Sequence, residues 1–236
     1  MEASHPPFLF DRPCLVALNV LSPIVYFPGQ DVHGMLVFED LWPQRGDFDF
    51  NDATVAYNYI IVLDPDGRVT SLDLTVNVLS LGSSLSNELM LHLPVPSGTA
   101  LDVSREFENG DVEPLAPAPD EGELVIPMTG DLRSLFANVT PPITTTDTVP
   151  SVPSAALRVR VRFETPQAID LAQAPFDLFL ARVGDRGHQF HRPQYAGTDT
   201  MNTSLFGTGD DASTPARHFV NHQGIPFVLN VPAVTL

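Results

Sequence analysis

The sequence contains no lysine, and all twelve of its cationic side chains are arginines. Schiff-base chemistry and lysine nucleophiles are therefore excluded. The arginines are too few to balance the acids, and the formal net charge is −17. A surface this acidic repels phosphate backbones and anionic lipids, so we expect no nucleic-acid partner. The single cysteine, Cys14, excludes an intrachain disulfide.

Long apolar runs are missing as well. No stretch of eighteen apolar residues occurs, so we predict no transmembrane segment. The 23 prolines argue against long helices. The first ten residues, MEASHPPFLF, lack the pattern of a signal peptide. We therefore expect any signal or membrane anchor to be absent from this chain.

Short alternating runs are abundant instead. In SLDLTVNVLSL (71–81), apolar and polar residues alternate with the period-two pattern of a half-buried strand. In ALRVRVRFETP (156–166), apolar residues point one way and three arginines point the other, on a face that we expect to be solvated or to protect a sheet edge. The residues DPDG (64–67) carry the proline and glycine of a hairpin turn.

Many short strands joined by proline-rich connections predict an all-β fold, an antiparallel β-sandwich that is jelly-roll-like. No break in composition marks a second domain, so we expect one domain over residues 1–236. Two segments are expected to be long loops. The first, 102–123, is acidic and rich in proline and alanine, and the second, 141–154, is rich in threonine, proline and serine.

The densest cluster of acids lies in FEDLWPQRGDFDFND (38–52). It contains six side chains with oxygen atoms suited to a metal ion, Glu39, Asp40, Asp47, Asp49, Asn51 and Asp52. Carboxylates this close repel one another unless a cation lies among them or water solvates them. If the segment is a strand, the oxygens from Asp47 to Asn51 share one face, and the two phenylalanines between them anchor the other face.

These ligands favour calcium over other metals. Ca²⁺ takes roughly six to eight hard oxygen ligands, and the cluster has no cysteine or histidine, which disfavours zinc. The cluster is not an EF-hand, because Asp52 stands at the sixth position, where that loop needs glycine. A solvated acidic strand edge without a metal is the alternative, and the residue types alone leave both interpretations open.

Residues 38–59 resemble the signature of the LruC-domain family, which is found in bacterial secreted proteins and outer-surface lipoproteins. The blocks FEDLWP and GDFDFND match that signature, with Phe48 where the family has tyrosine. Later blocks at 174–180, 186–195 and 202–232 are also similar to the family. The resemblance implies an all-β extracellular domain with a calcium-binding motif and no attached enzyme activity.

Two further groups of residues are candidates for binding. The stretch NTSLFGTGDDAST (202–214) contains Asp210 and Asp211, which either form a second cation or ligand loop or bond nearby backbone amides as turn residues. Four other side chains are candidates for ligand contacts, Trp42, His188, His191 and Tyr195. A histidine metal site is disfavoured, because no third histidine or cysteine is local to the pair.

We predict a calcium-binding extracellular or cell-surface module that is not an enzyme. Ca²⁺ is mainly structural in this hypothesis, and the module mediates adhesion, matrix or surface-filament contacts. Its partner is a protein or glycan at the cell surface, or another copy of itself. The alternative is a calcium-dependent, lectin-like carbohydrate-binding domain with an aromatic platform. A polysaccharide hydrolase with paired carboxylates ranks third, because the sequence has no other catalytic motif.

Overall fold

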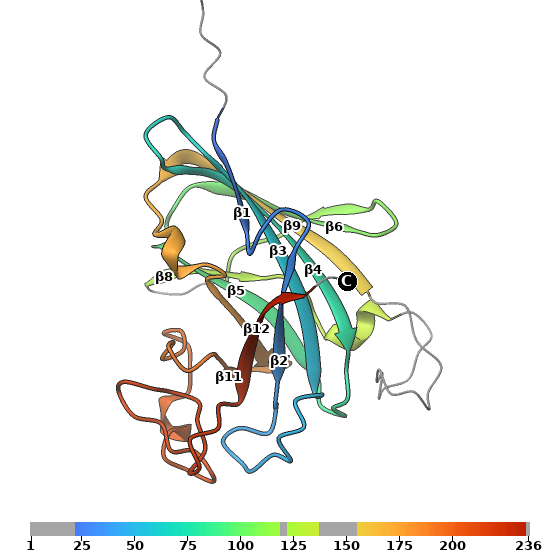
Figure 1. The fold of residues 1–236 in the computed structure, drawn as a ribbon, viewed down its shortest axis with the longest axis vertical. Helices are drawn as coiled ribbons and strands as arrows, with labels where there is room; N and C mark the ends of the chain where they lie inside the picture. Colours follow the sequence, from blue (N-terminus) through green and yellow to red (C-terminus); the bar gives the residue numbers. More distant parts are fainter. Residues whose placement is uncertain (1–21, 119–121, 137–154, 235–236) are drawn as a thin grey trace, which may run out of the picture.

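The computed structural model describes residues 22–118, 122–136 and 155–234, and these form an antiparallel β-sandwich (Figure 1). The all-β prediction is confirmed. The segment 141–154, which we expected to be a loop, lies outside the described residues. Within them, no helix is long and apolar enough to cross a membrane.

The larger sheet has eight strands within the described part of the chain. Seven follow the order β12-β2-β3-β4-β9-β6-β7, and β1 also pairs with β3. Their bounds are Ile24–Phe27 for β1, His33–Phe38 for β2, Ala53–Leu63 for β3, Val69–Ser80 for β4, Leu101–Phe107 for β6, Val112–Pro114 for β7, Ala155–Gln167 for β9 and Val228–Val234 for β12.

The smaller sheet has the order β11-β10-β5-β8. Its bounds are Asn87–Pro96 for β5, Glu123–Pro127 for β8, Asp177–Arg182 for β10 and Asp185–Phe190 for β11. Three short 3-10 helices lie in the connections, η1 at Leu132–Leu135, η2 at Leu171–Gln173 and η3 at Thr203–Leu205. Every strand pair in both sheets is antiparallel.

The alternating apolar residues build the core as the sequence predicts. In β4 the side chains of Leu72, Leu74, Val76 and Val78 have no exposed surface, while the residues between them are partly exposed. The same period-two pattern runs through β9. Side chains from both sheets join in one large apolar cluster, which packs the sheets face to face.

The predicted DPDG hairpin is confirmed between β3 and β4. The carboxylate of Asp64 accepts the backbone N–H groups of Asp66 and Arg68, at 2.9 and 2.8 Å. Gly67 has a φ angle of +80°, which glycine adopts without steric cost. This turn fixes the register between β3 and β4.

The acidic segment 102–123 is not the long loop that we expected. It contains most of β6, all of β7 and the first residue of β8, and β6 pairs along its length with β9. Glu106 pairs in register with Arg158, and its carboxylate lies 3.1 Å from the guanidinium of Arg160. The acids of β6 therefore balance charges that arrive from a distant strand, which local composition does not reveal.

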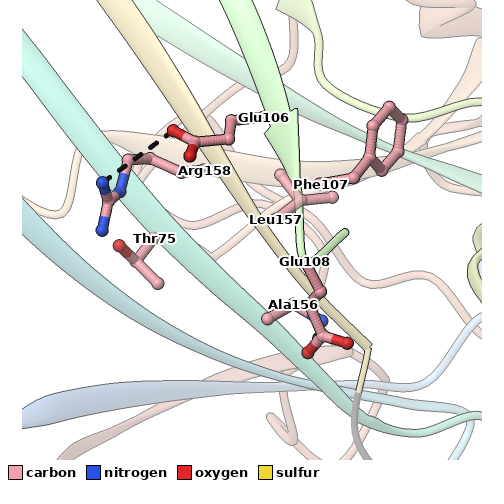
Figure 2. Close-up of a pocket in the computed structure, with 7 residues that line it drawn as sticks. All are labelled: Thr75, Glu106, Phe107, Glu108, Ala156, Leu157 and Arg158. Carbon is pink, nitrogen blue, oxygen red and sulfur yellow. Dashed lines mark hydrogen bonds and ion pairs between the residues drawn. The ribbon is translucent and has the colours of Figure 1, made fainter. Parts of the chain in front are cut away.

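The arginine face of β9 does not protect an edge, because β9 lies between β4 and β6. A groove of about 210 Å³ opens beside this face (Figure 2). In Figure 2 the side chains of Glu106 and Arg158 point toward each other, and their charged atoms are 3.9 Å apart. The groove is lined by Thr75, Glu106, Phe107, Glu108, Ala156, Leu157 and Arg158, so it shares no lining residue with the acidic loop.

Gly34 in β2 tests how tightly this core is packed. A Cβ atom at this position would collide with the ring and hydroxyl of Tyr57, which is 1% exposed and donates to Asn230 Oδ1 at 2.9 Å. We expect Gly34→Ala to lower the free energy of unfolding by about 1–3 kcal/mol through overpacking, measured by urea denaturation. Gly98→Ala is the matched control, because nothing lies within 4 Å of its Cβ position. Equal urea midpoints for the two variants would contradict this packing.

Candidate metal centre

Strand β2 ends at Phe38, and the next two residues are buried acids. Neither Glu39 nor Asp40 has exposed surface, and the backbone N–H of Glu39 donates to the carbonyl of Phe227 at 2.8 Å. A buried carboxylate is costly unless hydrogen-bond donors or cations surround it. The surrounding loops therefore have to supply partners for two adjacent charges.

Backbone N–H groups of the following loop surround the Glu39 carboxylate. Phe50 N–H donates to Oε1 at 2.5 Å, and Phe48 N–H donates to Oε2 at 3.1 Å. Both phenylalanines have left-handed backbone, with φ angles of +56° for Phe48 and +57° for Phe50. Successive turns of this kind form a concavity lined by N–H groups that binds anions. The anion here is the side chain of Glu39.

The strand arrangement considered for Asp47, Asp49 and Asn51 does not occur. Residues 45–52 contain no strand, because the left-handed residues within them break the extended conformation. Such a conformation costs of order 1 kcal/mol or more for a residue with a side chain, so other contacts have to maintain it. The ring of Phe48 supplies one of these contacts, packing against Phe227 with ring centroids 5.2 Å apart.

Three of the six predicted metal ligands converge. One carboxylate oxygen from each of Glu39, Asp47 and Asp49 lies within 4.8 Å of the other two. Glu39 is buried, whereas the two aspartates are exposed. Gly46 allows this approach, because a Cβ atom there would collide with Glu39 Oε2. The donors are hard oxygens without nitrogen or sulfur, and therefore fit a hard divalent cation.

The protein environment raises the pKa of Glu39 above its usual value. Burial is the main cause, and the negative charges of Asp47 and Asp49 add to it, while the N–H groups of Phe48 and Phe50 oppose it. A carboxylate with a raised pKa lacks sufficient positive charge nearby. A divalent cation among the three carboxylates would supply that charge.

Asp40 is not part of the Glu39–Asp47–Asp49 cluster, and its side chain binds residues of the smaller sheet instead. Its Oδ2 accepts the Asn87 side-chain N–H at 2.5 Å and lies 3.6 Å from the Arg182 guanidinium. Arg182 also donates to the Asp40 backbone carbonyl at 2.7 Å. Asp40 therefore joins the end of β2 to β5 and β10. Its other oxygen, Oδ1, is buried without a hydrogen-bond partner.

Asp52 and Asn51 hold the far end of the loop. The carboxylate of Asp52 accepts the backbone N–H of Asp40 at 2.8 Å, and burial followed by the nearby charge of Asp40 raises its pKa to about 7. Asn51 donates its side-chain N–H to the carboxylate of Asp49. Asn51 also lies against Gly82, whose N–H donates to the Asn51 carbonyl at 3.0 Å. These two residues position the cluster rather than complete it.

Trp42 is not an exposed platform for a ligand. It has no exposed surface, and its indole N–H donates to Asp211 Oδ1 at 2.7 Å. Its ring packs against Phe206 and Phe219, at centroid distances of 5.4 and 4.9 Å. The interpretation of Trp42 as a ligand contact is therefore wrong, because the 202–214 segment covers the ring.

Asp211 and Asp210 fasten this covering segment. The Asp211 carboxylate accepts N–H groups from Gly207 and Ser213 and the Ser213 hydroxyl, as well as the Trp42 indole. The backbone N–H of Asp210 donates to the carbonyl of Pro43 at 2.7 Å. Asp211 has the hydrogen bonds of a turn residue, and its oxygens are occupied without a cation.

The remaining ligand candidates are partly or fully buried. His188 Nε2 donates to the Trp42 carbonyl at 2.5 Å, so His188 supports the backbone of the segment FEDLWP (38–43). The Tyr195 ring lies under the guanidinium of Arg192, 5.1 Å from ring centroid to carbon. His191 has no exposed surface, and therefore no external ligand reaches it. Together with Trp42, these three side chains do not form one binding surface.

His191 belongs to a buried polar network in the smaller sheet. Its Nδ1 lies 2.8 Å from Asp177 Oδ2, and its Nε2 lies 2.8 Å from Gln189 Oε1. His92 approaches the same Asp177 oxygen at 3.6 Å. Burial alone would raise the pKa of Asp177, but His191 and then His92 outweigh it and lower the pKa to about 2.

Sequence reasoning missed several residues that hold this site. Asn87 and Arg182 compensate Asp40, and Asp177 compensates His191. Asp177 had a visible signal, because it is an acid inside the apolar run PFDLFL (175–180). An acid at a core position requires a buried partner. Arg182, two residues after this run and at the end of β10, carries a similar signal.

The family described as "Domain of unknown function (DUF4842)" matches residues 67–235. The matched range begins in the turn before β4 and leaves the acidic loop outside. No curated protein matches the chain. The resemblance to LruC domains is untested by these matches and stays a prediction.

Two solved structures are similar to this chain. A crystal structure described as a "Putative lipoprotein from Bacteroides ovatus" is 16% identical, with a TM-score of 0.58 over 89% of this chain. This chain spans 65% of the length of that one, and the likeness supports the fold alone. A second, described as "AvmM Catalyzes Macrocyclization in Alchivemycin A Biosynthesis", is 12% identical, with a TM-score of 0.31 over 61% of this chain and 77% of its own.

The lowered pKa of Asp177 predicts how acid affects stability. Its folded pKa is about 2 and its usual value 3.8, so its contribution is fully present above pH 3.8 and is lost as the pH falls through about 2. We expect the stability difference between the wild type and Asp177→Asn to shrink by roughly 2 kcal/mol over this range, because one pKa unit corresponds to about 1.4 kcal/mol. Urea denaturation at several pH values measures it. A difference that is independent of pH would contradict the charged pair.

Proposed function

The chain belongs to the DUF4842 family of domains of unknown function, and we propose that it is a calcium-binding extracellular module whose ion stabilises the fold. The observation that carries this proposal is the convergence of Glu39, Asp47 and Asp49 on one centre. A buried glutamate beside two exposed aspartates can hold an ion and leave further positions for water. In this proposal the ion fastens the 45–52 loop to the end of β2.

Calcium suits this arrangement better than magnesium. Ca²⁺ accepts an irregular set of six to eight oxygens, whereas Mg²⁺ demands a near-ideal octahedron. Three carboxylates provide up to six oxygens, and two of the three residues are exposed to the solvent that completes the set. Sites of extracellular modules bind calcium with dissociation constants of about 10⁻⁴–10⁻³ M, which matches a partly open site of this kind.

The proposed location is outside the cell or at its surface. Two observations support it, the resemblance of residues 38–59 to LruC domains and the similar fold of a protein described as a "Putative lipoprotein". Within this setting the module would contact a protein or glycan in adhesion, matrix or surface filaments, through loops that the ion holds in place. The lectin-like alternative loses support because Trp42, its main candidate platform, is buried.

The proposal predicts that calcium stabilises the wild-type protein against heat. At a calcium concentration ten times the dissociation constant, the ion adds about 1.4 kcal/mol. For a chain of this size we expect the melting temperature to rise by about 3–6 °C over the value in chelator. Differential scanning calorimetry measures the shift, and isothermal titration calorimetry measures the affinity.

Two variants separate site binding from a general charge effect. Asp47→Asn with Asp49→Asn removes two negative charges and keeps the side-chain shapes, so the calcium shift should disappear. Asp66→Asn removes an exposed charge from the DPDG turn and should keep the full shift. Equal melting temperatures of the wild type in calcium and in chelator would overturn the proposal. An undiminished shift in the double variant would overturn the assigned ligands.

A further inference from the structure

A buried amide, a hydroxyl and an imidazole lie in contact at the end of β11. They belong to Gln189, Thr198 and His191, which are 1%, 7% and 0% exposed. Thr198 lies in the loop that follows β11, and Gly197 before it has a left-handed φ of +93°. A Cβ atom at Gly197 would collide with the Met201 sulfur, so glycine is needed for the loop to fold back over Gln189.

Two donors polarise the carbonyl of the Gln189 side chain. The Thr198 backbone N–H donates to Oε1 at 3.1 Å, and His191 Nε2 lies 2.8 Å from the same oxygen. The amide orientation is fixed, because its nitrogen donates to the Arg186 carbonyl at 2.9 Å. His191 Nε2 therefore carries a proton, and Asp177 supports the imidazole from Nδ1 at 2.8 Å. Paired donors of this kind stabilise a developing oxyanion.

The Thr198 hydroxyl is placed as a nucleophile against this amide. Its Oγ1 lies 2.8 Å from Gln189 Nε2 and 3.3 Å from Oε1. Because the amide C–N bond is about 1.33 Å long, Oγ1 can be no farther than about 4.1 Å from the amide carbon Cδ. Fixed proximity of two reacting groups replaces a bimolecular encounter and supplies a large part of the barrier reduction.

Thr200 completes a path for the proton. Its hydroxyl lies 2.9 Å from Thr198 Oγ1 and 3.3 Å from Gln189 Nε2. It can accept the proton of the attacking hydroxyl and pass its own proton to the leaving nitrogen. The cluster therefore contains a nucleophile, an electrophile, oxyanion donors and a proton relay.

We propose that Thr198 and Gln189 form an intramolecular ester bond by an autocatalytic reaction within the folded protein. Thr198 Oγ1 attacks Gln189 Cδ, and the carbonyl electron pair moves to Oε1, where His191 and the Thr198 N–H stabilise it. The threonine proton passes through Thr200 to Nε2. The Cδ–N bond then breaks and ammonia leaves, so that one C–O bond replaces one C–N bond without oxidation or reduction.

Burial and the loss of ammonia favour the product. Ammonia leaves the protein and is protonated and diluted in water, which opposes the reverse reaction. The two joined side chains, Gln189 and Thr198, are 1% and 7% exposed, so water has little access to the ester and hydrolysis is slow. The bond would link β11 covalently to the loop that follows it. This loop leads into the 202–214 segment, which covers Trp42. The product is a covalent cross-link that needs neither cysteine nor lysine. The chain has one cysteine and no lysine.

Intact-protein mass spectrometry of the purified full chain tests the proposal. We expect the wild-type mass to be lower than the sequence mass by one ammonia molecule, and peptide mapping to recover Gln189 and Thr198 in one cross-linked species. Hydroxylamine should cleave the link and leave a hydroxamate at position 189. A wild-type mass equal to the sequence mass, unchanged after a week of incubation of the folded protein, would overturn the proposal.

Variants assign the roles of the groups. Thr198→Val keeps the shape and removes the nucleophile, so it should show no ammonia loss, while Thr198→Ser should still form the bond. Thr200→Val should slow formation by roughly a hundredfold, the typical contribution of a placed proton-transfer group. His191→Gln should slow it by about 10²–10³-fold through loss of an oxyanion donor. Ammonia loss that persists in Thr198→Val would place the reaction elsewhere and overturn the assignment.

Discussion

The structure depends on two adjacent carboxylates, Glu39 and Asp40, that are buried at the end of β2. Buried charge is tolerated only where donors or cations surround it, and a chain of net charge −17 has few cations to give. The protein meets this constraint in two different ways. Asp40 takes an asparagine and an arginine from the smaller sheet, whereas Glu39 takes backbone N–H groups from its own loop.

The hexapeptide FEDLWP (38–43) is consequently the place where distant segments meet. Its acids reach β5, β10 and the 45–52 loop, and its tryptophan reaches Asp211. The carbonyls of Trp42 and Pro43 accept further donors from His188 and Asp210. Because most of these contacts join segments far apart in the sequence, a cation that lowers the repulsion at Glu39 would stabilise the whole end of the sandwich.

Sequence reasoning succeeded where local pattern reflects burial, as in the alternation of β4 and β9 and the DPDG turn. It also placed Glu39, Asp47 and Asp49 in one cluster. It failed where a partner comes from elsewhere, because Asp40 pairs with Arg182 and Trp42 is covered by a segment some 160 residues away. The left-handed Phe48 and Phe50 were also unpredictable, since phenylalanine disfavours that backbone and only tertiary contacts impose it.

The central claim is that the carboxylate of Glu39 binds the backbone N–H groups of Phe48 and Phe50 and a cation at the same time. Nuclear magnetic resonance measures this directly, through the amide signals of these two residues during a calcium titration. We predict slow hydrogen exchange for both amides and large, saturable shifts that exceed those of other loop amides. Unshifted Phe48 and Phe50 signals at saturating calcium, or rapid exchange of both amides in its presence, would contradict the account.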